Sequence, residues 1–481
     1  MIIISRLARL CLPGLVLFAN PAFSNPVLSN PAPDFSACSD SAQHPDLQGS
    51  LCSRVVVPLA YATAKQNASA GAEQIELFIR KFPAPGRSQG SVWIINGGPG
   101  ESGATSYSLV ASLKRGFPHM DIVIPDHRGT GFSGKICPKE EAPDSAAGIA
   151  LEGAEWGSCF AAMHQMATRT REFGISNAAH DLHTLIRRFD DRKPLYLYGV
   201  SYGTQLILRT LQLGKLPLKG VVLDSLVPPQ TNGDYDLSQR SHNTDEVGRV
   251  VLAQCDRDPA CHAMMGDSVA TVYRQLLDQL QANPERANTM PRKNLKLFLG
   301  RLLDFPATRA RIPWLIRDLA NGKQDELEAV SKLLKQSTTR FGQYPQSSPS
   351  IPLTMVISMS ENTLRPEISA EQVKTNDSAL MFTSDLPGFL AAPSAYPVYA
   401  KDRFYGKEPE NFPPLLVLQG KLDPKTPYAG ALLHINALRQ HGNVQLVSVP
   451  DAPHFILAFA PQCFEQATRA FVRGQPLPLC K

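Results

Sequence analysis

The stretch Leu195–Leu213 (LYLYGVSYGTQLILRTLQL) decides the fold of this chain. It runs from a mainly apolar segment, Leu195–Val200, into a helical pattern, Thr204–Leu213, through a Gly-x-Ser-x-Gly turn centred on Ser201. A short run without charged residues is typical of a strand that is buried on both faces. At a tight turn from strand to helix, flanking glycines relieve crowding and the serine hydroxyl projects above the sheet. The stretch therefore predicts a buried strand that presents Ser201 as a nucleophile.

Other segments repeat this alternation of strand and helix. Further buried strands are predicted at Ser91–Asn96, Asp121–Asp126, Gly220–Asp224, Leu415–Gly420 and Val444–Val449. Helical spacing of apolar residues occurs at Ser176–Phe189, with Ser176 as the predicted N-cap, at Tyr428–Gln440 and at Phe464–Val472. Such alternation predicts an α/β fold with a mainly parallel sheet that is covered by helices.

The alternation stops between about Pro228 and Tyr396. Helix-like segments replace the apolar runs there, at Val269–Leu280, Leu295–Leu303 and Asp325–Leu334. Because strands of the earlier character resume at Leu415, we predict one α/β core, residues 25–227 and 396–481. A mostly helical insertion, residues 228–395, divides it.

A serine nucleophile needs a base, and the base needs an acid that orients it. Asp423 follows the strand at Leu415–Gly420, and His454 follows the strand at Val444–Val449. Open α/β sheets place their sites at these carboxyl ends of strands. The order serine, acid, histidine along the chain is the order expected for a serine on such a turn. We therefore predict Asp423 as the acid and His454 as the base, with Asp451 as a weaker alternative acid.

The segment Asn96–Gly103 (NGGPGESG) follows the first predicted core strand and offers exposed backbone amides. An acyl-transfer transition state needs such donors for its oxyanion. We predict the amide of Gly98 as one donor, with Gly97 as the second choice, and the amide of Tyr202 as the other. The same glycines also match the Gly-x-Gly-x-x-Gly fingerprint of dinucleotide sites. Pro99 argues against that reading, since it removes an amide from the phosphate turn.

The first segment, Met1–Ser24, has the order of a secretory signal peptide. Arg6 and Arg9 precede an apolar run, Leu10–Ala19, and small residues follow at the predicted cleavage site near Ser24. The alternative is a buried N-terminal helix. The run is too short to span a bilayer, so we expect no stable membrane anchor. We predict export to a periplasm or to the extracellular space.

Cleavage of the signal would remove Cys11 and leave an even number of cysteines, as expected for disulfides in an oxidising compartment. Spacing alone does not fix their connectivity. They nevertheless fall into four local couples, which we predict as Cys38–Cys52, Cys137–Cys159, Cys255–Cys261 and Cys463–Cys480.

Composition excludes several classes of protein. Hydrophobic residues make up 43% and charged residues 19%, which is the profile of a folded chain and not of a disordered one. The formal charge of +5 and the absence of a dense basic run argue against nucleic acid as a partner. No cluster has zinc-ligand spacing, and His180 with His183 is better explained as a polar helix face. We predict no metal.

Five motifs together resemble those of one family. They are Asn96–Gly103 (NGGPGESG), Asp126–Ser133 (DHRGTGFS), Gly199–Leu206 (GVSYGTQL), Leu418–Pro427 (LQGKLDPKTP) and Asp451–Phe455 (DAPHF). In this order they are similar to the prolyl and tripeptidyl aminopeptidases among the α/β-hydrolases, and most to the secreted tripeptidyl-aminopeptidase-like branch. The resemblance implies an α/β-hydrolase fold with a helical cap. It covers residues from about Ser91 to Lys481 and is weakest in the insertion.

The resemblance also implies roles for the residues that match. Ser201 would be the nucleophile, Asp423 the acid and His454 the base, with no cofactor. Asp126 and Arg128 would hold loops together without taking part in chemistry. The substrates would be peptides with a free N-terminus, cleaved through an acyl-enzyme. One departure is Asn96, where the prolyl branch usually has histidine.

A second departure concerns the acid that would bind the substrate's ammonium group. The tripeptidyl-type branch tends to show Cys-x-Asp after an apolar run in the insertion, whereas this chain has Met359 and Glu361. We predict Glu361 as the acid, with Glu101 and Glu246 as the other candidates. Two alternatives stay open: an esterase or amidase of small acyl compounds on the same fold, and a hydrolase-like binding protein without catalysis.

Overall fold

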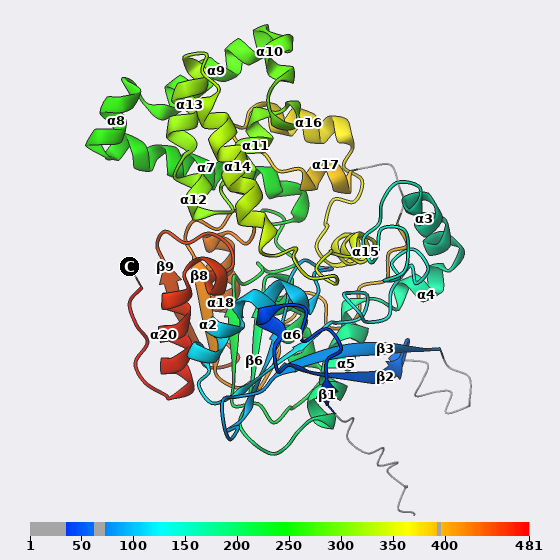
Figure 1. Ribbon diagram of the computed structural model, residues 1–481. Coiled ribbons are helices and arrows are strands. Elements are labelled where there is room, and N and C mark those ends of the chain that lie inside the picture. Colours follow the sequence, from blue (N-terminus) through cyan, green and yellow to red (C-terminus); the bar gives the residue numbers. More distant parts are fainter. Residues whose placement is uncertain (1–34, 62–72, 392–395, 481) are drawn as a thin grey trace, which may run out of the picture. The chain divides into compact units, whose positions relative to one another are not determined.

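The computed structural model describes residues 35–61, 73–391 and 396–480. The predicted signal segment Met1–Ser24, including Cys11, lies outside these residues. The described chain forms a nine-stranded sheet in the order β1-β2-β3-β5-β4-β6-β7-β8-β9 (Figure 1). The strands are β1 (Ser36–Ala37), β2 (Leu51–Pro58), β3 (Gln74–Phe82), β4 (Ser91–Ile95), β5 (Asp121–Pro125), β6 (Leu195–Val200), β7 (Gly220–Asp224), β8 (Leu415–Gly420) and β9 (Val444–Val449).

Strands β4 to β9 pair in parallel, and each lies within a residue of its predicted position. The antiparallel strands β1 to β3 were not predicted. The apolar run of β2 is short, since Val55–Val57 lies between the charged Arg54 and Pro58. The prediction that β9 is buried on both faces is wrong. Its Gln445 and Ser448 are only half-buried, because β9 is the last strand of the sheet.

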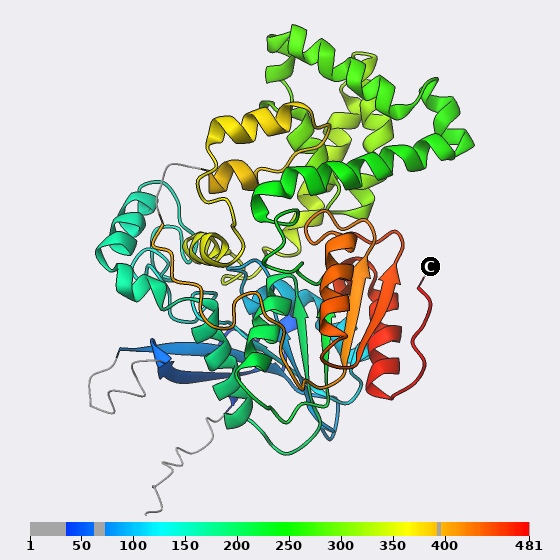
Figure 2. The ribbon, with the colours of Figure 1, turned by 180° about the vertical axis from the view of Figure 1, so that it is seen from behind.

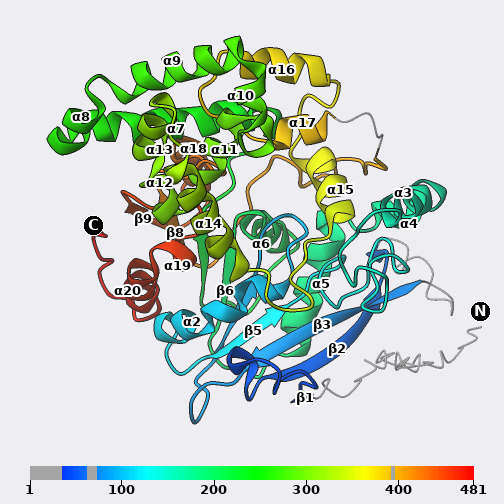
Figure 3. The same cartoon turned by 45° about the horizontal axis from the view of Figure 1, so that its top comes forward.

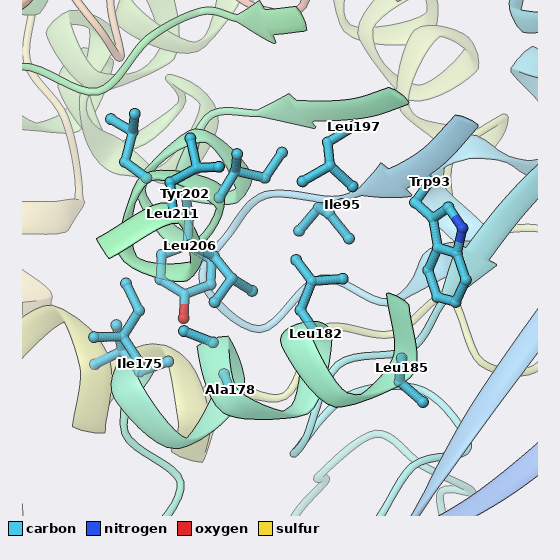
Figure 4. Close-up of a cluster of buried hydrophobic side chains, with 14 of the residues drawn as sticks. Trp93, Ile95, Ile175, Ala178, Leu182, Leu185, Leu197, Tyr202, Leu206 and Leu211 are labelled. Atoms are coloured by element: carbon cyan, nitrogen blue, oxygen red, sulfur yellow. The ribbon is translucent and has the colours of Figure 1, made fainter. Parts of the chain in front are cut away.

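Helices cover both faces of the sheet. The helices and 3₁₀ turns of the core are η1 (Pro45–Leu47), η2 (Gly103–Leu109), α2 (Val110–Gly116), α3 (Glu155–Gln165), α4 (Ala167–Arg171), α5 (Ile175–Arg188), α6 (Tyr202–Gln212), α18 (Tyr428–Leu438), α19 (Ile456–Phe459) and α20 (Pro461–Val472). On one face, Leu182 of α5 and Leu206 of α6 pack with Trp93 and Leu197 of the strands (Figure 4). On the other, Leu113 of α2 packs in one cluster with residues of α20. The predicted α/β layering is therefore present.

The start of α5 differs from the prediction. The helix begins at Ile175 with Gly174 as its N-cap, so Ser176 is not the capping residue. The Ser176 hydroxyl accepts a hydrogen bond from Arg209 at 2.6 Å and donates to Asp402. Its side chain thus links α5 and α6 to a segment that follows the insertion.

Residues 228–395 contain, within their described part, helices and no strand. They are η3 (Leu237–Gln239), α7 (Arg240–Arg257), α8 (Pro259–Met265), α9 (Val269–Ala282), α10 (Pro284–Asn288), η4 (Pro291–Lys293), α11 (Leu295–Leu302), α12 (Pro306–Arg309), α13 (Ile312–Ala320), α14 (Asp325–Thr339), α15 (Ile351–Glu361), α16 (Ala370–Ser378) and α17 (Leu386–Leu390). Most of them group together apart from the sheet, as the green and yellow helices of Figure 2 show. Leu252, Tyr273, Leu299 and Ile316 belong to their own apolar cluster. We call this group the cap.

Helix α15 is an exception within the predicted insertion. Its Leu353, Val356 and Ile357 belong to the apolar cluster of the core, and Figure 3 shows the helix apart from the cap helices α7 to α13. The Thr354 hydroxyl donates to the carbonyl of Pro99 at 2.5 Å. This part of the insertion therefore packs on the core, next to the Asn96–Gly103 loop.

The chain returns from the cap to β8 without a helix between residues 396 and 414. This return segment lies against α5 and α6. The Tyr399 hydroxyl accepts from the backbone amide of Ile175 at 3.2 Å, and Gln212 donates to the carbonyl of Phe404 at 3.2 Å. Hydrogen bonds to helices of the core thus fix the connection that precedes β8.

The described residues form four disulfides: Cys38–Cys52, Cys137–Cys159, Cys255–Cys261 and Cys463–Cys480. These are the four predicted local couples. Each closes a short loop, and one of them lies within the cap between α7 and α8. In the described part of the chain, no helix has the length and apolar character needed to cross a membrane.

Candidate active site

Ser201 lies at the turn between β6 and α6. Its backbone has φ 54° and ψ −125°, a conformation that non-glycine residues rarely adopt. The amide of Ser201 donates to the carbonyl of Asp224, at the end of the neighbouring strand β7, at 3.0 Å. Strained residues of this kind persist only where surrounding structure holds them, and they concentrate at functional sites. The turn thus presents the side chain of Ser201 at the carboxyl edge of the sheet.

His454 and Asp423 meet beside this turn. The Nδ1 atom of His454 donates to Oδ2 of Asp423 at 2.8 Å. Asp423 is fully buried, whereas His454 retains some exposure. Because Nδ1 is held by Asp423, the other ring nitrogen, Nε2, is left to face a reacting group. The structure therefore brings the predicted acid and base together, while Asp451 is exposed and is not this partner.

The loop after β8 supplies further donors to Asp423. The amides of Lys425 and Thr426 each donate to Oδ1 at 2.8 Å, and the Thr426 hydroxyl donates to Oδ2 at 2.7 Å. Burial opposes ionisation of Asp423, but the charge of His454 and these hydrogen bonds outweigh it. The pKa of Asp423 is therefore lowered below its ordinary value of 3.8. The carboxylate is held ionised next to His454.

A cavity of about 600 Å³ connects these groups. Ser201, Tyr202 and His454 line it from the core, and residues of the cap such as Leu237 and Phe305 line it from the insertion. Aromatic rings of Phe341, Phe455 and Phe459 also face it. The arrangement offers a partly apolar chamber in which a serine, a histidine and a bound acyl group can meet.

The predicted oxyanion loop lies against the serine. A Cβ atom on Gly97 would lie 2.9 Å from Cβ of Ser201, which places this backbone next to the nucleophile. Gly98 lines the cavity and has φ +106°, a conformation that favours glycine. Tyr202 is the first residue of α6, so its amide has no acceptor within the helix. The backbones of Gly98 and Tyr202 are therefore available for a negative oxygen near Ser201.

The three candidate acids lie in different places. Glu101 lines the cavity, and no hydrogen bond or ion pair of its carboxylate is found among the described residues. Glu361 does not line the cavity: its carboxylate is buried, 3.3 Å from Arg209 and 2.7 Å from Gln230. Glu246 is exposed on α7 and does not line the cavity either. Of the three candidates, the structure thus places Glu101 at the cavity and pairs Glu361 with Arg209.

Burial raises the pKa of Glu101, and the positive charges of Lys425 and His454 oppose this shift. Both opposing groups belong to the loops that carry the acid and the base. Glu101 therefore places a carboxyl group close to the predicted catalytic residues, where a cation bound in the cavity would stabilise its ionised form.

The Asp126–Ser133 motif contacts loops and does not line the cavity. Asp126 accepts from the amides of Gly103 at 2.6 Å and Phe132 at 2.8 Å. Arg128 donates to both oxygens of Asp181, at 2.6 Å and 2.7 Å, and to three backbone carbonyls. These contacts fit the structural role that the resemblance implies for both residues.

His180 and His183 lie on α5, away from the cavity residues. The ring of His180 stacks on Tyr61 at a centroid distance of 4.9 Å. Within the described ranges, no three His, Cys, Asp or Glu side chains lie close enough together to hold a metal ion.

Asp224 is a residue of the site that the sequence did not reveal. Its buried carboxylate accepts from the amides of Ile456 at 2.8 Å and Leu457 at 2.9 Å, directly after His454. It also accepts from the hydroxyls of Tyr198 and Ser225. Since the Asp224 carbonyl accepts from the Ser201 amide as well, one residue links the serine turn to the histidine loop. The only sequence signal was its place at the end of a predicted strand.

Replacing Asp224 by asparagine is expected to lower the free energy of unfolding by about 1–3 kcal/mol, because one backbone amide loses its acceptor. The rate of hydrolysis should fall as well, since the His454 loop loses one of its hydrogen bonds. Asp245→Asn is the matched control. Asp245 has a buried carboxylate that accepts hydrogen bonds from two backbone amides within the cap. Denaturant unfolding and hydrolysis rates of both variants are compared. Equal rates for the two variants would contradict the proposed link.

Comparisons with known proteins show which family model and which proteins this chain is similar to. Residues 90–461 match the family described as the alpha/beta hydrolase fold. "Serine protease Hip1" of Mycobacterium tuberculosis (strain ATCC 25618 / H37Rv) is 23% identical over 465 residues, which span 89% of this chain and 86% of that protein. "Putative hydrolase YuaR" of Escherichia coli (strain K12) is 24% identical over 406 residues, 79% of this chain and 78% of that one. A thermophilic esterase from Thermogutta terrifontis superposes with a TM-score of 0.39 at 14% identity, covering 88% and 98% of the two chains.

Proposed function

This chain belongs to the alpha/beta hydrolase fold family, and from that premise we propose that it is a serine exopeptidase acting near the free N-terminus of peptides. The observation that carries the hydrolytic part is the pairing of His454 with Asp423 in the cavity that Ser201 also lines. The similarity to a protein named as a serine protease supports the same chemistry. The exopeptidase part rests on Glu101.

In the proposed reaction, Ser201 Oγ attacks the carbonyl carbon of the scissile bond while His454 Nε2 takes the hydroxyl proton. Asp423 holds the imidazole through Nδ1 and stabilises the cation that forms. The backbone amides of Gly98 and Tyr202 donate to the oxyanion. Collapse of the tetrahedral intermediate breaks the C–N bond, and His454 returns the proton to the leaving amine. Water then hydrolyses the acyl-enzyme by the same route.

Glu101 gives the cavity a preference for a cation close to the nucleophile. Oε2 of Glu101 lies 3.5 Å from the Cβ position of Gly97, which is itself beside Ser201. A carboxylate at this place suits the α-ammonium group of a peptide whose carbonyl is bound at Ser201, because charge-assisted hydrogen bonds are the stronger kind. A blocked N-terminus offers no such cation. The proposal is thus a preference for free over acetylated substrates.

The test compares fluorogenic amides of Pro, Ala and Ala-Ala-Pro with free and with acetylated N-termini, alongside a short-chain ester. We expect the ratio of kcat/KM for free over acetylated substrates to exceed one in the wild type. In Glu101→Gln the ratio should fall about 10- to 100-fold, the size of a lost hydrogen bond to a charged group. Glu246→Gln, an exposed glutamate of the cap, is the control and should keep the wild-type ratio.

Other results would select the alternatives. Equal cleavage of free and blocked amides, or cleavage of the ester alone, would replace the exopeptidase by an esterase or amidase. Turnover of none of these substrates would favour a binding protein without catalysis.

We also propose that the mature protein is exported. The four disulfides support this, since such bonds form and persist in oxidising compartments such as a periplasm or the extracellular space.

A further inference from the structure

Among the residues that the structure describes, one cation that lines the cavity has no counter-ion. The charged residues that line the cavity are Glu101, Asp236, Arg240, Asp304 and Lys425, in addition to His454. Arg240 is the first residue of α7, and its side chain is half-buried. Among the described residues, no acidic group forms an ion pair or hydrogen bond with its guanidinium. The other cation, Lys425, pairs with Asp304 at 3.1 Å.

The acids around Arg240 are engaged elsewhere. Asp304, Asp385 and Asp423 are the groups whose negative charge acts on it. Asp304 is paired with Lys425, and Asp385 with Arg292 at 2.7 Å. Asp423 is bound by His454 and the donors of its own loop.

A fourth acid, Asp236, also lines the cavity close to Arg240 in the chain. It accepts from the amides of Ser238 and Leu364, and its nearest cation is Arg365 at 3.9 Å. None of these four carboxylates is therefore left to neutralise Arg240, and the carboxylate of Glu101 forms no ion pair with it.

Burial of a guanidinium without a partner is unfavourable. Burial lowers the pKa of Arg240, and the negative charges of Asp423, Asp304 and Asp385 oppose this shift. An anion in the cavity would remove the penalty. A guanidinium presents a planar set of donors that matches a carboxylate with two parallel hydrogen bonds. Arg240 thus has the chemistry of a carboxylate receptor, on the cap side of the chamber that Ser201 lines from the core.

We propose that Arg240 binds a carboxylate of the substrate, so that the enzyme prefers short peptides that carry one. The carboxylate comes either from the free C-terminus of a short peptide or from an acidic side chain. The inference rests on the proposed peptidase function. Together with Glu101 it makes the cavity complementary to a short zwitterionic peptide, with the ammonium near the nucleophile and the carboxylate at the cap.

Binding is measured apart from turnover, by calorimetry on Ser201→Ala. One arm compares Ala-Ala-Ala with its C-terminal amide, and the other compares Ala-Asp-Ala-amide with Ala-Asn-Ala-amide. In one of the two arms, we expect the peptide with the carboxylate to bind about 10- to 100-fold more tightly than the neutral peptide. Arg240→Gln in the same background should abolish that difference. The arm that shows the difference identifies the source of the carboxylate. Arg240→Lys keeps the charge and should retain part of the difference.

Arg249→Gln is the matched control, since Arg249 lies on the same helix, is exposed and pairs with Asp245 outside the cavity. It should leave both ratios unchanged. Equal affinity for acid and neutral peptides in both arms, or a difference that survives in Arg240→Gln, would overturn the inference. Hydrolysis of the same peptides by the wild type tests the proposed function separately. Tight, Arg240-dependent binding without hydrolysis would refute the peptidase and leave the receptor in place.

Discussion

Replacing Ser201 by alanine is expected to lower kcat roughly 10⁶-fold, because the nucleophile of the acyl-enzyme route is removed and only binding and oxyanion stabilisation remain. The structure predicts little damage to the fold. The serine hydroxyl lines the cavity, and the backbone amide keeps its hydrogen bond to the Asp224 carbonyl. Steady-state rates on the best peptide and ester substrates measure the loss, and denaturant unfolding measures the stability.

Ser348→Ala is the control for this variant, since Ser348 also lines the cavity but lies outside the serine turn. It should retain wild-type kcat. If Ser201→Ala keeps more than a small fraction of the rate while Ser348→Ala does not, the nucleophile has been assigned to the wrong serine.

Replacing Asp423 by asparagine is expected to lower kcat about 10⁴-fold. The amide has nearly the same shape, but it carries no charge to stabilise the His454 cation. Its NH₂ group can also hold His454 in the tautomer that has no free acceptor at Nε2. Asp451→Asn, the alternative acid of the histidine loop, should leave kcat near the wild-type value. The reverse outcome would exchange the two roles.

The same variant changes the pH dependence of stability. The folded pKa of Asp423 is lowered relative to its ordinary value of 3.8, so its ionised form stabilises the folded state at neutral pH. This contribution to stability is fully present above pH 3.8. It is lost as the pH falls from there through the pKa of Asp423 in the folded state. The difference in free energy of unfolding between wild type and Asp423→Asn should therefore be largest at neutral pH and shrink on acidification. A difference that grows toward low pH would contradict the sign of this shift.

The parallel part of the sheet was predictable because most of its strands are short apolar runs, as at Val221–Leu223. The antiparallel strands were not, since charged residues such as Arg54 of β2 and Glu76 of β3 interrupt their apolar residues and β1 has only two residues. The extra helix α3 was missed for a similar reason: few of its side chains are buried, so its apolar pattern is faint.

The residues of the proposed triad were predictable because each follows a strand within a short motif. Partners that depend on the order of the strands were not. Asp224 is important only because β7 lies between β6 and β8, which places it between the serine turn and the loop of Asp423. The pairing of Glu361 was not predictable either, because its partner Arg209 comes from α6, 152 positions away in the chain. Arg240 stands out only once the neighbouring acids are seen to be paired.

The return segment, residues 396–414, has a consequence for how such proteins can diversify. Strands β7 and β8 are parallel neighbours, so the chain between them must travel back along the sheet, which takes roughly a dozen residues or more. The return segment spans this distance and is hydrogen-bonded to α5 and α6. The cap helices before it take no part in this connection along the sheet. They can therefore be exchanged for others of different size and charge while the sheet keeps its register. New substrate preferences can then arise on an unchanged hydrolytic scaffold.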